Sequence, residues 1–164
     1  IADDVTERLE NGILDMGLLL EPVEVSRYHF ARMPLEEKWQ VLMRKDCSLA
    51  RKDNISPEDL ANMPLIIAKR QSVRNLLENW FSDRVEKIRI ASTFNLSHNN
   101  ESMMVESGMG LALVMEFACN NEALCLRPLN PEIASGCVLV WKKNQTRSLA
   151  MTCFINYVKT FLTM

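Results

Sequence analysis

The sequence predicts an α/β fold. Short apolar runs typical of buried strands alternate along the chain with segments whose apolar residues recur at helical spacing. Glycines, prolines and capping residues stand at the points where one period gives way to the other. With 164 residues and a hydrophobic fraction of 48%, the chain can bury one sizeable core or two small ones.

Charge and cysteine usage exclude several classes of protein. The formal net charge is −2, and acidic and basic residues are interspersed, so no basic face is expected for a phosphate backbone. No apolar run is long enough to span a bilayer, and the first residues lack an export signal, which favours the cytoplasm. Five cysteines without a Cys-x-x-Cys pair indicate reduced core thiols, not a disulfide framework.

The chain is expected to open with a helix followed by a buried strand. Asp3 can cap a helix that runs to Asn11, and Gly12 can end it. Residues 13–20 are an apolar run typical of a strand covered on both faces. A parallel sheet would need a further strand to feed such a helix. We therefore expect the chain to be a fragment that begins inside an α/β unit.

Two more strands are expected before the pattern of the chain changes. They lie at residues 28–34 and 39–44, after a loop marked by Glu21-Pro22. The second of these strands joins two differently patterned regions, so it could act as a hinge.

The middle of the chain begins with a strong helix-start signal. In Ser56-Pro-Glu-Asp, the serine can cap, proline suits the first helical position, and the acids favour the positive end of the helix dipole. The further elements expected here are strands at 64–68, 87–93 and 111–115, a helix at 73–82, and a second helix that ends at Gly108.

Three elements are expected in the last part of the chain. Residues 124–129 form a strand that returns the chain to its first region, and residues 137–142 form an apolar strand. Ser148 can cap a final helix, and the side chains expected to face inward from it are Leu149, Cys153, Phe154, Tyr157 and Phe161.

An ordered set of short motifs resembles the effector-binding domain of LysR-type transcriptional regulators. The central motif is Glu106-Ser-Gly-Met-Gly-Leu-Ala, preceded by Thr93-Phe-Asn-Leu. The other motifs follow the order of that family and are Leu14-Asp-Met-Gly-Leu, Trp39-Gln-Val-Leu-Met-Arg-Lys-Asp, Ile55-Ser-Pro-Glu-Asp-Leu, Pro64-Leu-Ile and Val140-Trp-Lys-Lys. Together they cover nearly the whole chain.

The resemblance implies two Rossmann-like lobes joined by two crossover strands, a fold like that of type II periplasmic binding proteins. It assigns residues 1–40 to lobe I, 41–124 to lobe II and 125–164 to the segment that returns to lobe I. It also implies that the first strand and helix of lobe I, and a winged helix-turn-helix domain, precede this chain. Dimers or tetramers would form through this domain in the full regulator, and DNA would be bound through the absent domain.

Polar residues follow two predicted strands at positions where open α/β sheets bind ligands. Ser72 can cap the helix after the first of these strands, and the free amides beside it form an anion site to which Arg70 could add charge. Thr93, Phe94 and Asn95 follow the next strand. For Ser72 and Asn95, capping is as good an explanation as ligand contact, and the two roles can coexist.

In the resembled family, loops at these positions line a cleft between the lobes that binds a small metabolite. The turn at Ala2 and the residues around Leu20 would face the same cleft from lobe I. The candidate ligand-binding residues are therefore Ala2, Leu20, Arg70, Gln71, Ser72, Thr93, Phe94 and Asn95. Arg70 and the helix amides favour an anionic or carboxylate effector.

Neither a catalytic site nor a cofactor is expected. A Gly-x-Ser-x-Gly elbow is absent, and His29 and His98 lack neighbours at metal-ligand spacing. Gly108-Met-Gly lacks a third glycine and ends a helix, so it indicates a helix stop rather than a phosphate loop. The methionines of this central stretch are expected to fill the core, namely Met103, Met104, Met109 and Met115.

The most favoured function is therefore effector sensing in a LysR-type regulator. A solute-binding protein of the same two-lobed fold is the alternative, and the motifs at Trp39 and Val140 favour the regulator. An enzyme on a similar scaffold would need a reactive cysteine or lysine in the cleft, which selective labelling of one thiol would reveal.

Overall fold

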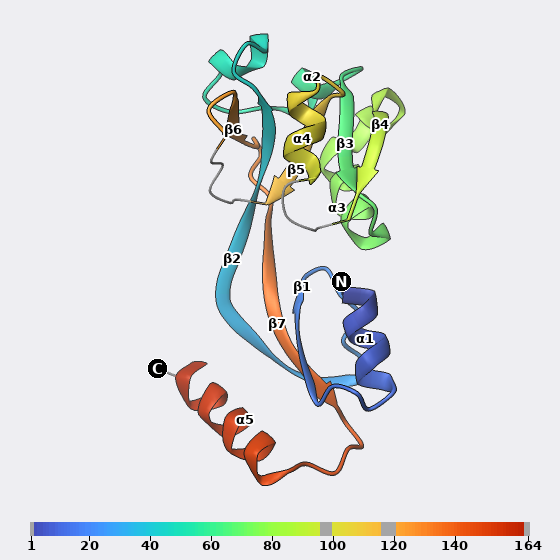
Figure 1. The fold of residues 1–164 in the computed structure, drawn as a ribbon, viewed down its shortest axis with the longest axis vertical. Helices are drawn as coiled ribbons and strands as arrows, with labels where there is room; N and C mark the ends of the chain where they lie inside the picture. Colours follow the sequence, from blue (N-terminus) through green and yellow to red (C-terminus); the bar gives the residue numbers. More distant parts are fainter. Residues whose placement is uncertain (1, 96–99, 116–120, 163–164) are drawn as a thin grey trace. The chain divides into compact units, whose positions relative to one another are not determined.

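The computed structural model describes residues 2–95, 100–115 and 121–162 and confirms the α/β class (Figure 1). The chain divides into two compact units, one formed by Ile1–Glu36 with Ser135–Met164, the other by Glu37–Ala134. It passes from one unit to the other twice, within strand β2 (Tyr28–Arg44) and at Ala134. By this division residues 125–134, which the resemblance assigns to the return segment, belong to the second unit.

The described residues of the first unit form the helices α1 (Ala2–Glu10) and α5 (Leu149–Leu162) and the neighbouring strands β1 (Met16–Leu20), β7 (Ala134–Lys142) and the beginning of β2. β1 pairs with β7 from Met16 opposite Trp141 to Leu20 opposite Cys137. Asp3 lies inside α1 instead of capping it, whereas Gly12 ends the helix as predicted, with φ at 69°.

Strand β7 is covered by a helix on each face, because successive side chains of a strand point to opposite sides. Val138 and Val140 pack with residues of α1 in one buried cluster. Leu139 and Trp141 pack with residues of α5 in another. Figure 1 shows α1 and α5 on either side of β7. The apolar run predicted at 137–142 is therefore a strand buried on both faces.

The inward face predicted for α5 is wrong. The side chains that pack against β7 are those of Met151, Ile155 and Val158. All five residues that were expected to face inward are exposed, namely Leu149, Cys153, Phe154, Tyr157 and Phe161. The helix is apolar on nearly every side, so its periodicity does not distinguish the two faces. Its predicted start is confirmed, since Ser148 Oγ accepts a hydrogen bond from the N–H of Met151 at 3.1 Å.

The second unit contains the parallel part of the sheet. Its elements after β2 are η1 (Ser48–Arg51), α2 (Pro57–Leu60), β3 (Pro64–Ala68), α3 (Gln71–Phe81), η2 (Ser82–Lys87), β4 (Arg89–Phe94), α4 (Asn100–Glu106), β5 (Leu111–Met115) and β6 (Leu124–Pro128). β3 pairs in parallel with β4 and β5, whereas β2 pairs in antiparallel fashion with β5 and β6. The carboxyl ends of β3, β4 and β5 therefore lie at one edge.

One strand replaces two that were predicted. Residues 28–34 and 39–44 belong to a single strand of 17 residues, β2. The intervening Glu36-Glu-Lys suggested a break, but these residues are mostly solvent-exposed and remain extended. Charged residues are compatible with a strand wherever its side chains face water.

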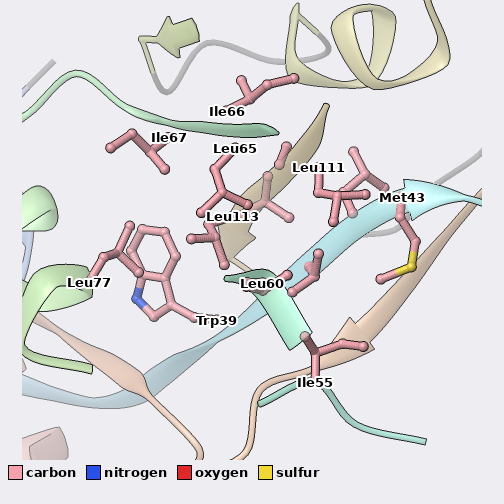
Figure 2. Close-up of a cluster of buried hydrophobic side chains, with 14 of the residues drawn as sticks. Trp39, Met43, Ile55, Leu60, Leu65, Ile66, Ile67, Leu77, Leu111 and Leu113 are labelled. Atoms are coloured by element: carbon pink, nitrogen blue, oxygen red, sulfur yellow. The ribbon is translucent and has the colours of Figure 1, made fainter. Parts of the chain in front are cut away.

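The core of the second unit is built on the apolar strands (Figure 2). Trp39, Leu65, Ile66 and Leu113 are at most 1% exposed. Truncating one such leucine to alanine typically costs about 2–5 kcal/mol of stability. The methionine prediction is wrong in part, because Met104 and Met115 pack against this core whereas Met103 and Met109 are exposed.

Two glycines are required at the turn between α4 and β5. Gly108 has φ at 81° and ends the helix, as the sequence predicts. A Cβ atom on Gly110 would stand 2.3 Å from the carbonyl oxygen of Pro64, so only glycine lets the chain approach β3 this closely. Among the described residues, no helix is long and apolar enough to be a candidate membrane span.

Candidate functional site

The structure brings the two polar loops predicted from the sequence side by side. β3 and β4 are parallel, and their last residues, Ala68 and Phe94, are opposite each other. The backbone N–H of Lys69 donates a hydrogen bond of 2.9 Å to the carbonyl oxygen of Phe94. Residues 70–72 and 93–95 therefore leave the sheet at the same edge, where open α/β sheets bind their ligands.

The start of α3 differs from the prediction at Ser72. The cap residue is Arg70, which has extended backbone angles (φ −63°, ψ 126°) and makes no side-chain capping bond. Its carbonyl oxygen accepts hydrogen bonds from the N–H groups of Val73 and Arg74, both at 3.1 Å. Ser72 is thus already inside the helix, and the prediction that it caps α3 is wrong. Its Oγ is buried and has no hydrogen-bond partner among the described residues.

The uncapped start of α3 is suited to an anion. The first N–H groups of a helix have no intrahelical acceptor, and the helix dipole places partial positive charge there. The amides of Gln71 and Ser72, the Ser72 hydroxyl and the half-buried Arg70 lie together in this turn. The exposed side chain of Gln71 is directed along the helix, since its Nε2 donates to Asn75 Oδ1 at 2.7 Å.

The remaining candidate residues have different surroundings. Thr93 and Asn95 are exposed at the end of β4, whereas the Phe94 side chain is 6% exposed and packs in the core. Only the backbone of Phe94 therefore contributes to the loop surface. Ala2 is buried in α1 and Leu20 ends β1. Both belong to the first unit, and their part in ligand binding stays a prediction.

Comparison of the sequence with protein-family models identifies the family of this chain. The family model described as the LysR substrate binding domain matches residues 1–163. The chain belongs to the LysR substrate-binding domain family. This match confirms the resemblance read from the ordered motifs, and it favours the regulator over the solute-binding alternative.

Similarity to individual transcriptional regulators is consistent with this family assignment. An uncharacterized HTH-type regulator of Bacillus subtilis, YvbU, is 26% identical over 162 residues, which are 96% of this chain and 53% of that protein. The C-terminal domain of a probable LysR regulator from Rhodococcus sp. RHA1 is 18% identical with a TM-score of 0.77, over 96% of this chain and 80% of that one. A LysR regulator from Pseudomonas aeruginosa is 20% identical with a TM-score of 0.76, over 99% and 59%.

The two structural matches show a shared fold. The chain spans about half the length of the curated relative it matches. The LysR family is one of transcriptional regulators and not an enzyme class.

This LysR substrate-binding domain also has a buried carboxylate that was not predicted from the sequence. Glu101, in the first turn of α4, is 7% exposed, and its Oε2 has no hydrogen-bond partner among the described residues. The signal was present in the sequence, because Glu101 stands one helical turn before the core residue Val105. A buried carboxylate oxygen without a hydrogen-bond partner is costly, so Glu101 is expected to reduce the stability of the fold.

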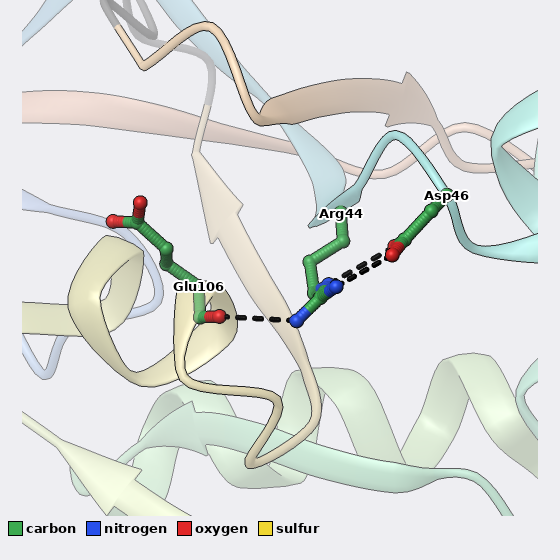
Figure 3. Close-up of polar contacts among 3 residues, drawn as sticks. All are labelled: Arg44, Asp46 and Glu106. Atoms are coloured by element: carbon green, nitrogen blue, oxygen red, sulfur yellow. Dashed lines mark hydrogen bonds and ion pairs between the residues drawn. The ribbon is translucent and has the colours of Figure 1, made fainter.

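The other end of α4 is held by Arg44 at the end of β2 (Figure 3). Arg44 binds both carboxylate oxygens of Asp46, at 3.0 and 2.5 Å, and donates to the carbonyl oxygen of Glu106 at 3.4 Å. The hydrogen bonds with Arg44 lower the pKa of Asp46, so the pair stays charged near neutral pH. A cation at a helix C-terminus stabilises the helix dipole.

The described cysteines and histidines form no metal site. In the described ranges no group of three or more His, Cys, Asp or Glu side chains is placed to hold a metal ion. His29 is exposed, whereas His98 and Cys119 lie outside the described residues. None of the four described cysteines forms a disulfide. Cys137 is buried, but Cys153 is exposed, so the prediction of core thiols is wrong there.

Proposed function

We propose that this domain senses a small metabolite and passes the signal to a DNA-binding domain of the same regulator. The observation that carries the proposal is the common edge at which residues 70–72 and 93–95 leave the parallel strands β3 and β4. Related proteins support it: a regulatory domain from Synechocystis, CcmR, is described in complex with 2-PG, and a domain of BenM as effector-binding.

The effector class that fits this edge is a carboxylate or another small anion. The start of α3 offers free amides, an unpaired Ser72 hydroxyl and Arg70, and no capping side chain competes for them. Thr93 and Asn95 add exposed polar groups on the neighbouring loop. Ala2 and Leu20 would contribute from the first unit.

The mechanism is differential binding. A ligand shifts a regulator only to the extent that it binds one of its states more tightly, and typical couplings are about 1–3 kcal/mol. We assign the two lobes to the two compact units, lobe I to Ile1–Glu36 with Ser135–Met164 and lobe II to Glu37–Ala134. The metabolite would favour one arrangement of the regulator, and a homodimer or tetramer in the cytoplasm would pass the change to DNA. None of these steps needs a catalytic residue or a cofactor.

Substitution of Arg70 or Thr93 by alanine tests the assignment of the edge. A thermal-shift screen of the chain against small carboxylate and aromatic metabolites identifies a compound that raises the melting temperature with concentration. Arg70→Ala should weaken its binding by about tenfold or more, the loss expected for one charge-assisted hydrogen bond. Thr93→Ala should weaken it less, and neither should change the stability of the free protein by more than about 0.5 kcal/mol.

Arg89→Ala is the matched control, because Arg89 is an exposed residue at the opposite end of the strand that carries Thr93. It should leave the affinity unchanged. If Arg70→Ala and Thr93→Ala both bind the compound as tightly as the parent protein, the site does not lie at this edge.

A further inference from the structure

A small pocket opens between α3 and the β3–β4 part of the sheet. Its volume is about 120 Å³. The lining is mainly apolar, with two charged side chains of α3, and consists of Ile67, Arg74, Leu77, Glu78, Phe81, Ile88 and Ile90. None of these residues belongs to the loops at 70–72 or 93–95. The pocket is therefore separate from the proposed effector site.

The apolar lining is not a solvent-exposed patch. Ile67, Leu77 and Phe81 are at most 5% exposed, whereas Ile90 is 41% exposed on β4. β4 is the last strand in the pairing order of the sheet, so one side of the pocket is formed by an edge strand. A buried floor with an open rim allows a small molecule to enter without unfolding of the helix.

Arg74 gives the pocket a polar group without a partner. Its Nε is buried and has no hydrogen-bond acceptor among the described residues. Glu78 lies one turn further along the same helix, yet no ion pair joins it to Arg74 in the part of the chain that is described. A buried donor left unsatisfied costs about 1–3 kcal/mol, so an acceptor that enters the pocket would recover part of this loss.

We propose that this pocket is a second binding site, for a small branched or aromatic monocarboxylate. The volume is of the order of the ~150 Å³ cavity that accepts benzene in an apolar protein core. The isoleucines, Leu77 and Phe81 would enclose the apolar tail, and Arg74 would donate to the carboxylate. Glu78 on the same rim would repel a second negative charge, which restricts the site to monoanions.

Methyl NMR of the chain, labelled at the isoleucine δ1 positions, tests the proposal with isovalerate as the probe. Binding should produce saturable shifts of the signals of Ile67, Ile88 and Ile90. The signals of Ile55 and Ile66, which are core residues outside the pocket lining, should not move. Isopentylamine has the same tail with an ammonium that cannot accept a hydrogen bond, and it should bind about tenfold more weakly or not at all.

Two variants separate this pocket from the effector site. Arg74→Met keeps the apolar stem and removes the donor, so isovalerate should bind about tenfold more weakly. Arg70→Ala should leave the isovalerate affinity unchanged. The absence of saturable shifts up to the solubility limit of isovalerate would overturn the proposal. So would an affinity that Arg74→Met leaves intact, or shifts that Arg70→Ala abolishes, because the probe would then bind at the loops.

Discussion

Asp59, in the first turn of α2, and Arg70, at the N-cap of α3, differ in what they offer to the start of their helix. The carboxylate of Asp59 accepts hydrogen bonds from the N–H and hydroxyl of Ser56, at 3.1 and 3.2 Å, and from Lys52 Nζ at 2.6 Å. Partial burial disfavours the charged form of Asp59, but these bonds outweigh it and lower the pKa. Arg70 offers α3 no such side-chain cap. The satisfied helix start serves stability, and the unsatisfied one is available to a ligand.

Glu101 should reduce the stability of the domain. Leucine in its place would fill a similar volume without leaving a carboxylate unpaired, so Glu101→Leu should raise the free energy of unfolding by about 1–3 kcal/mol. Glu101→Gln should raise it less, because the amide stays polar. Denaturant unfolding of the three proteins measures both differences. A loss of stability in Glu101→Leu would mean that the carboxylate has a stabilising partner.

Among single residues, the sequence predicts those roles that depend only on local chemistry, such as helix caps and helix stops. The caps at Ser56 and Ser148 and the stop at Gly108 follow from one residue and its neighbours, and the structure confirms them. Ser72 has the same chemistry but lies two positions past the cap residue, Arg70, and therefore does not cap the helix. The spacing of Glu101 to Val105 places it on the buried face of α4, but its charge points the other way, because glutamate side chains usually reach solvent.

At the scale of elements, the first unit depends on contacts between α1, β2 and β7. Tyr28 of β2 is buried, and its hydroxyl donates to Glu10 Oε1 of α1 at 2.7 Å. Burial, and then the hydrogen bond to Glu10, raise the pKa of Tyr28 to about 12. The folded chain therefore holds this proton more tightly than the unfolded chain, whose tyrosines titrate near 10.

The stability that Tyr28 contributes should be complete below about pH 10 and should be lost as the pH rises toward about 12. Tyr28→Phe should remove this part of the pH dependence. Tyr157 is the other tyrosine and is 70% exposed, so a Tyr157→Phe variant allows Tyr28 to be titrated alone by its ultraviolet absorbance. A midpoint near 10 in that variant would show that the hydroxyl is not held as the structure indicates.

The positions of some helices and strands could be predicted from the sequence, whereas the orientation or the length of others could not. The buried strands β3 and β5 were predicted at 64–68 and 111–115, where the structure places them, because short apolar runs between turn signals suit nothing else well. The orientation of α5 could not be predicted, since apolar residues stand on several of its faces and only β7 selects the inward one. The continuity of β2 was hidden by its exposed charged residues.

At the scale of the whole molecule, the order of motifs carried more information than any one of them. The motif at Glu106 describes only a helix stop and a strand, but the ordered set identified a family that the match over residues 1–163 confirms. The boundaries of the two units were less predictable, because they depend on which distant segments pair. Under the proposed site assignment, the choice of effector would depend on a few side chains at one edge of the sheet, and the fold alone does not identify the effector.

The central claim is that a small metabolite binds where β3 and β4 end. The most direct test is an amide NMR titration of the ¹⁵N-labelled chain with the compound identified by thermal shift. Saturable shifts are expected at residues 69–73 and 93–95, and they should be lost in Arg70→Ala. Shifts that leave both loops unchanged, with saturation elsewhere in the domain, would contradict it.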